Sequence, residues 1–181
     1  MIANLIAGLI GNGAVAVGDY ESLQTVTVGA GGQASISFTS IPTGYSHLQV
    51  RAIAISTITV DAKYIFNSDN GNNYSYHLLV GNGSSAAAYA ATTQPFIKGA
   101  PFTSSTASNF GAGVVDILDY SNTNKNKTVR TLTGYDNNGS GEIQFISGAW
   151  YSTNAINSIT ITPSSGTTWG QYSSFALYGV K

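Results

Sequence analysis

The sequence predicts an all-β domain, an antiparallel β-sandwich of the jelly-roll type, with an apolar N-terminal arm. Three observations predict this fold class. From Tyr20 onward, short runs rich in Val, Ile, Thr, Tyr and Phe alternate between apolar and polar residues. Gly, Asn and Pro follow these runs at regular intervals, as turns between antiparallel strands do. The body lacks the apolar spacing of helices, so it lacks the crossover helices that a parallel sheet needs.

The chain divides into an arm, residues 1–19, and a sandwich body, residues 20–181. Met1 to Gly18 carries no charge, and its large apolar residues fall at helical spacing. A secretory signal would need a basic start, which is missing, and a membrane span would need about twenty apolar residues. We therefore expect an arm that docks on partner subunits, with packing on its own domain as the alternative. The expected contact residues are Ile2, Leu5, Ile6, Leu9 and Ile10.

About ten strands are expected in the body, each followed by turn residues. The clearest alternation places Leu48, Val50, Ala52 and Ala54 on one face of a strand. Asn137-Asn138-Gly139 suits the positive φ angles that a hairpin turn requires. The expected strands are 25–28, 34–38, 48–55, 62–67, 74–80, 113–119, 128–135, 142–151, 156–162 and 172–180.

The segment 84–108 changes character. It is low in complexity, rich in Ala, Ser and Thr, and contains Pro95 and Pro101. We expect a long loop here, and loops of this length are often functional.

Charge is the outlier in the composition. Only 8% of residues are charged, against about 25% in ordinary soluble domains. A weakly charged polar surface suits a protein packed against other subunits, and the net charge of -1 argues against a nucleic-acid partner. The one basic cluster, Lys125, Lys127 and Arg130, is expected to be the exposed flank of a loop.

No catalytic residue, metal site or cofactor is predicted. His47 and His77 lie in strand contexts without metal-ligand spacing, and Asp116 and Asp119 are expected on opposite faces of their strand. Asp69 to Asn73 could hold a calcium ion, but a hydrogen-bonded turn is favoured because the downstream acidic ligand is missing. The acidic residues that a hydrolase pair would need are too few and too scattered to predict one; they are Asp61, Asp116, Asp136 and Glu142.

Aromatic residues near strand ends give a second candidate site. Trp150, Trp169 and Tyr172 could stack on a sugar if their rings were exposed, with Tyr151 and Tyr178 nearby. Core positions are the favoured interpretation, because buried aromatics of a sandwich give the same pattern.

The segment Gln171 to Lys181 resembles the closing strand of small β-sandwich virion proteins of tailed bacteriophages, of the capsid-decoration or tail-associated type. Further matching segments are 34–42, 66–69, 73–76 and 155–163. The resemblance runs from about Thr25 to the C-terminus and leaves out the arm. It implies a β-sandwich, often trimeric, without catalytic activity.

Two functions follow as hypotheses. The first is a capsid decoration (cement) protein that stabilises the shell through its arm and oligomer contacts, with the major capsid protein or other virion subunits as partners. The second is a tail fibre, knob or receptor-binding module that recognises a host glycan through the segment 84–108 and the aromatic strand ends. Both place the protein in the virion, on the capsid surface or the tail, as a homo-oligomer with neither nucleic acid nor membrane as a partner. A polysaccharide hydrolase is the least favoured.

Overall fold

The computed structural model describes residues 18–101, 103–104 and 108–181. The regular secondary structure of these residues consists of strands alone, so the predicted all-β antiparallel class is confirmed. None of the described residues belongs to a helix able to cross a membrane. The strands are β1 (Tyr20–Thr27), β2 (Ile36–Phe38), β3 (His47–Ala54), β4 (Ala62–Phe66), β5 (Tyr74–Gly81), β6 (Ala86–Gln94), β7 (Ile97–Gly99), β8 (Gly111–Leu118), β9 (Lys127–Asp136), β10 (Gly141–Trp150), β11 (Ile159–Pro163) and β12 (Ser174–Val180).

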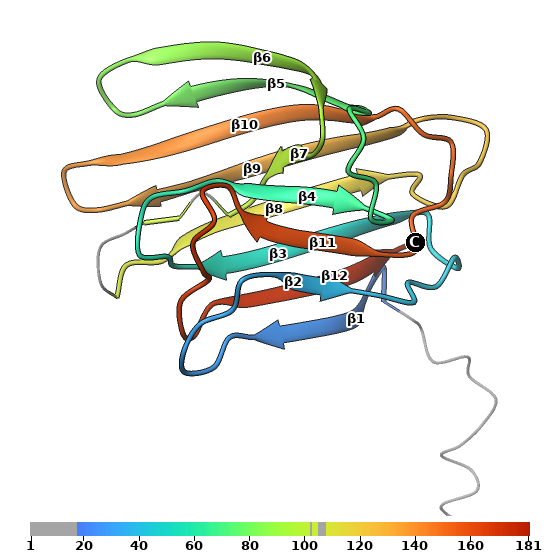
Figure 1. Ribbon diagram of the computed structural model, residues 1–181, viewed down its shortest axis with the longest axis horizontal. Coiled ribbons are helices and arrows are strands. Elements are labelled where there is room, and N and C mark those ends of the chain that lie inside the picture. Colours follow the sequence, from blue (N-terminus) through green and yellow to red (C-terminus); the bar gives the residue numbers. More distant parts are fainter. Residues whose placement is uncertain (1–17, 102, 105–107) are drawn as a thin grey trace, which may run out of the picture.

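The strands form two antiparallel sheets. The large sheet has eight strands in the order β1-β12-β3-β8-β9-β10-β5-β6, and the small sheet has four in the order β2-β11-β4-β7. Figure 1 shows the small sheet over part of the large one, with β5 and β6 extending beyond it. We call β1, β12, β3 and β8 the core half of the large sheet, and β9, β10, β5 and β6 the extension.

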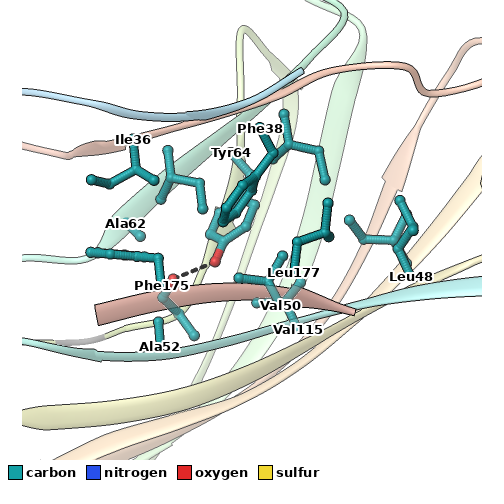
Figure 2. Packing of buried hydrophobic residues seen from close by; sticks show 14 of the residues in the cluster. Ile36, Phe38, Leu48, Val50, Ala52, Ala62, Tyr64, Val115, Phe175 and Leu177 are labelled. Carbon is teal, nitrogen blue, oxygen red and sulfur yellow. Dashed lines mark hydrogen bonds between the residues drawn. The ribbon is translucent and has the colours of Figure 1, made fainter. Parts of the chain in front are cut away.

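The two sheets share one buried cluster, because alternate side chains of their strands point into the space between the sheets. In β3, Leu48, Val50, Ala52 and Ala54 are buried while Arg51 and Ile53 are exposed, which confirms the predicted alternation. Figure 2 shows side chains of β2 and β4 pointing toward those of β3, β8 and β12. The Tyr64 hydroxyl is fully buried and donates to the Ala100 carbonyl at 2.7 Å, so its polar atom is satisfied inside the core.

The predicted long loop at 84–108 is wrong in part, since its first half forms β6 and β7. β6 pairs with β5 at the edge of the large sheet, and most of its side chains are exposed. An exposed edge strand needs backbone pairing and not large apolar residues, so an alanine-rich run can serve. β7 is the edge of the small sheet and buries Ile97.

Two hairpins build most of the extension. β9 and β10 are joined through Asn137 to Ser140, where Asn138 has φ 54° and Gly139 φ 121°, as the sequence predicted for this turn. β5 and β6 are joined by a turn in which Asn82 Oδ1 accepts from the backbone amides of Ser84 and Ser85. The extension therefore depends on local hairpin pairing, whereas β1 pairs with β12 from the other end of the sequence.

Candidate functional site

The residues predicted for the docking arm lie outside the described part of the chain. Ile2, Leu5, Ile6, Leu9 and Ile10 are therefore not placed, and the arm stays a prediction.

The two tryptophans predicted as possible sugar platforms are buried. Trp150 is 1% exposed and Trp169 0%, so neither ring offers a face to a ligand. Trp150 Nε1 donates to Asp69 Oδ2 at 2.7 Å, and Trp169 Nε1 donates to the Ile161 carbonyl at 3.3 Å. Both rings are core residues, the interpretation that the sequence favoured. Only Tyr172 of the three candidates is exposed, at 71%.

The turn from Asp69 to Asn73 is held by hydrogen bonds to the Asp69 carboxylate. Oδ1 accepts from the Gly71 amide, and Oδ2 accepts from Trp150 Nε1 and Asn73 Nδ2. Burial raises the pKa of Asp69, but these hydrogen bonds outweigh burial and hold the pKa below its usual value. Because N–H donors take the lone pairs that calcium would need, the turn is a structural device.

The two histidines and the aspartates Asp116 and Asp119 make separate local contacts and do not form a common site. His47 Nδ1 accepts from the Asp119 amide at 2.9 Å, while the Asp119 carboxylate lies 2.5 Å from Lys125 Nζ. Asp116 instead accepts from Gln49 Nε2 on β3. His77 is exposed on β5. In the described ranges no three His, Cys, Asp or Glu side chains gather as metal ligands.

Lys127 corrects the expectation of an exposed basic flank, because it is fully buried. Its amino group donates to the carbonyls of Asn122, Lys125 and Thr153 at 2.7, 3.0 and 3.1 Å. Burial lowers the pKa of the Lys127 amine. The side chain thus joins the loop before β9 to the loop after β10 at the base of the extension, a structural role that the local charge pattern did not suggest.

The first unassigned surface is the outer face of the large sheet, which we define as the face turned away from the small sheet. Directly opposed residues of antiparallel strands share a face, so the register identifies its rows. One row crosses β5, β10, β9 and β8 through apolar residues alone: Leu79, Phe145, Leu132 and Val114. Leu79, Phe145 and Leu132 are 61%, 53% and 51% exposed.

A second apolar row lies beside the first. It runs through Gly81, Ile143, Gly134, Ala112 and Ile53, and Ile143 and Ile53 are more than half exposed. Because glycines flank Ile143, the surface is hollowed, and an open groove of about 550 Å³ lies along β8, β9 and β10. We call the two rows together the apolar rows.

The next row on the same face is polar. It consists of His77, Ser147, Arg130, Asp116 and Gln49. Arg130 Nη1 donates to Ser147 Oγ at 2.7 Å, and Gln49 Nε2 donates to Asp116 Oδ1 at 2.7 Å. The apolar rows are thus bounded on one side by a row whose polar groups bond to one another. That arrangement is typical of an interaction surface with a polar rim.

The second unassigned feature is a cavity of about 440 Å³ on the opposite, inner face of the extension. It lies between β5, β6 and β10 of the large sheet and the β7 edge of the small sheet, and its lining includes Tyr76, Tyr89, Lys98, Asp61 and Glu142. Asp61 Oδ2 and Lys98 Nζ form an ion pair at 2.8 Å whose side chains are only 16% and 23% exposed. The cavity thus combines a partly buried ion pair with tyrosine rings.

Gln144 connects the charged groups of this cavity. Its Nε2 donates to Glu142 Oε1 at 2.7 Å and to Asp61 Oδ1 at 3.2 Å. From the sequence, the acidic residues were expected to be too scattered to form a pair. In the structure, the carboxylates of Asp61 and Glu142 both accept from Gln144 Nε2. The pairing of distant strands causes this convergence, and spacing along the sequence does not contain it.

No protein-family model matches the chain, and no curated protein is significantly similar to it.

Proposed function

We propose that the chain is a structural subunit of a bacteriophage virion, a capsid decoration (cement) protein that docks on neighbouring subunits. The observation that carries this proposal is the pair of apolar rows on the outer face, where large apolar side chains that are each more than half exposed share a single sheet surface. Ordinary surfaces scatter such residues singly, whereas contiguous apolar patches are typical of contact with another protein.

The strand pairing supports a jelly-roll sandwich, the finer fold that the sequence predicted. β1 pairs with β12, β2 with β11, β3 with β8 and β4 with β7, so the pairs are nested like one long hairpin. The pairing of β12 with β3 and of β11 with β4 rolls this hairpin into two sheets. We infer a jelly roll with the β5–β6 and β9–β10 hairpins inserted, an architecture that viral capsid domains use repeatedly.

The composition supports permanent assembly. A chain with 8% charged residues has little charge to repel an identical neighbour, and the apolar rows contain none. Burying each half-exposed Leu, Ile or Phe of the rows would contribute on the order of 1 kcal/mol. Repetition over a shell would multiply that modest contribution, which the predicted arm (Ile2, Leu5, Ile6, Leu9 and Ile10) would supplement. We extend the proposal to a homo-oligomer, a trimer by the resemblance.

The experiment is quantitative mass spectrometry of purified particles. It compares particles that contain the unaltered chain with particles that contain the double variant Leu132→Asp, Phe145→Asp. We expect near-stoichiometric copies relative to the major shell protein for the unaltered chain, and loss of most copies for the double variant. Burying two carboxylates in an apolar contact is strongly unfavourable. The matched control is His77→Asp with Ser147→Asp, in the adjacent polar row.

A few copies per particle for the unaltered chain, or full retention of the Leu132→Asp, Phe145→Asp double variant, would contradict decoration through this face. Replacing Leu5, Ile6 and Leu9 by Ser tests the arm in the same assay. Loss of copies with a folded body is the expected result, and unchanged occupancy would overturn the arm's role.

A second candidate is a receptor-binding module of the tail that recognises a host glycan. The observation that favours it is the mixed polar and aromatic cavity, because β6 and β7, which wall it, come from the segment 84–108 that the sequence marked as functional. Copy number separates the two roles, since a decoration protein is present in hundreds of copies and a fibre in few.

A further inference from the structure

We propose that the cavity on the inner face of the extension is a binding site for a neutral saccharide. It deepens the second candidate function, on whose glycan-binding role it rests, and it is separable from the decoration function because the cavity and the apolar rows lie on opposite faces of the large sheet. A subunit docked through its outer face would leave this cavity open.

The first argument is where the chain places its few charges. Asp61, Lys98 and Glu142 line this one cavity in a chain that has only seven basic and eight acidic residues. A partly buried ion pair contributes little to stability, since desolvation offsets most of its attraction. The concentration of scarce charges around a hollow is therefore better explained by a ligand than by folding.

The second argument is the state of Gln144. Both of its Nε2 partners are carboxylates, which only accept hydrogen bonds, so the amide orientation is fixed. Its Oε1 is buried and has no hydrogen-bond partner among the described residues. An unpaired buried acceptor costs about 1–3 kcal/mol. The protein thus accepts a local loss of stability to hold Gln144 between Asp61 and Glu142.

The third argument is the aromatic lining. Tyr89 is 59% exposed on β6, and Tyr76 lines the same cavity from β5. Burial raises the pKa of the Tyr76 hydroxyl, and Lys98 and Asp61 act on it with opposite signs, so this hydroxyl lies within the same polar group. The ring of Tyr89 can stack on the C–H face of a sugar.

The chemistry of the lining selects the ligand class. Carboxylate oxygens accept hydrogen bonds from hydroxyl groups, and the lysine ammonium donates to hydroxyl or ring oxygens. Asp61 and Lys98 neutralise each other in part, and Glu142 adds one negative charge, so the lining disfavours an anionic ligand. Glu142 Oε1 already accepts from Gln144 Nε2, so the site is not built around a free ionic contact. An uncharged molecule with one apolar C–H face and many hydroxyls fits this combination of ring and hydrogen-bonding groups.

The test is saturation-transfer NMR, followed by titration, on the full chain. The probes are the methyl glycosides of glucose, galactose, mannose, rhamnose and N-acetylglucosamine, with sialic acid and glucosamine as charged comparisons. We expect saturable binding of at least one neutral glycoside. Tyr89→Ala and Asp61→Asn should each weaken it about tenfold, equivalent to about 1.4 kcal/mol.

The matched controls are Tyr20→Ala, an exposed ring on β1 at the opposite edge of the large sheet from β6, and Asp116→Asn, a carboxylate on the outer face. Both should bind as the unaltered chain does, and circular dichroism checks that every variant is folded. Binding by none of the neutral glycosides, binding of the charged probes alone, or equal losses in the controls would each overturn the proposal. Particle occupancy should be unchanged in the cavity variants, so failure here is distinguishable from failure of the decoration function.

Discussion

Side chains alternate between the two faces in both halves of the large sheet, but the halves use this alternation for different purposes. In the core half, the large apolar residues lie almost entirely inward, as Leu48, Val50, Phe175 and Leu177 do. Toward β1 the outer side of this half is polar or aromatic, with Arg51 stacked on the rings of Tyr20 and Tyr178. The apolar rows reach this half only through β8 and through Ile53 of β3.

The extension distributes its residues the other way. Its contribution to the shared core is limited to Tyr74, Val129 and Trp150, near one end of its strands. Farther along, the inner side carries the polar cavity, while Leu79 and Phe145 point outward. The core half supplies most of the shared core, and we propose that the extension serves contact with other molecules.

The largest effect that tests this comparison comes from replacing one phenylalanine by alanine in each half. Phe175→Ala removes a fully buried ring that packs on Trp169 at 5.1 Å, so we expect a loss of about 3–5 kcal/mol of unfolding free energy. Phe145→Ala in the extension should cost about 1 kcal/mol or less, because its ring is 53% exposed. Urea denaturation of the free protein measures both. Similar losses for the two variants would remove the distinction between the halves.

A smaller effect is expected at the base of the extension. Lys127→Met leaves the carbonyls of Asn122, Lys125 and Thr153 without their donor and should cost about 3 kcal/mol. Lys125→Met is the control, since its ammonium is half exposed and pairs with Asp119 at the surface. Thermal unfolding and amide hydrogen exchange at β9 and β10 report the change. Equal behaviour of the two lysine variants would show that the buried amine does not fasten the extension.

The smallest effect depends on pH and concerns Tyr74 of β5, whose hydroxyl accepts from the Phe66 amide of β4 at 3.0 Å and so links the extension to the small sheet. Burial raises the pKa of Tyr74 from 10.0 to about 12. The neutral phenol is therefore favoured by the folded state, and its stabilising contribution is complete below pH 10 and is lost as pH rises toward 12. Tyr74→Phe should cost about 1 kcal/mol at neutral pH and make stability fall less steeply in that window. Chemical denaturation from pH 8 to 12 tests it, with Tyr172→Phe as the control, and an unchanged slope would contradict the assignment.

The fold was predictable where each strand meets the core with a regular pattern. β3, β11 and β12 alternate cleanly, and their inward faces were readable from the sequence. β6 and β7 were missed because an alanine-rich edge strand and a strand of three residues carry too little pattern. Lys127 was misplaced because the carbonyls that receive it come from loops far apart in sequence.

The candidate sites were harder to predict for the same reason. The apolar rows and the cavity both depend on register between strands, which no local pattern specifies. One signal was present in β10, where Ile143 and Phe145 lie on the opposite face of the strand from Ile146 and Trp150. Large apolar residues on both faces of a strand indicate that both faces are meant to be covered. The sequence thus held a sign of the apolar rows, though not of their extent.

The pairing of β1 with β12, the first and last strands of the described residues, has a consequence for how the chain folds. The Lys181 amide donates to the Asp19 carbonyl at 3.1 Å, and Tyr20 stands opposite Val180. Closing so long a loop is slow compared with forming the local hairpins β5–β6 and β9–β10. During synthesis, β1 therefore has no strand to pair with in the large sheet until β12 has left the ribosome.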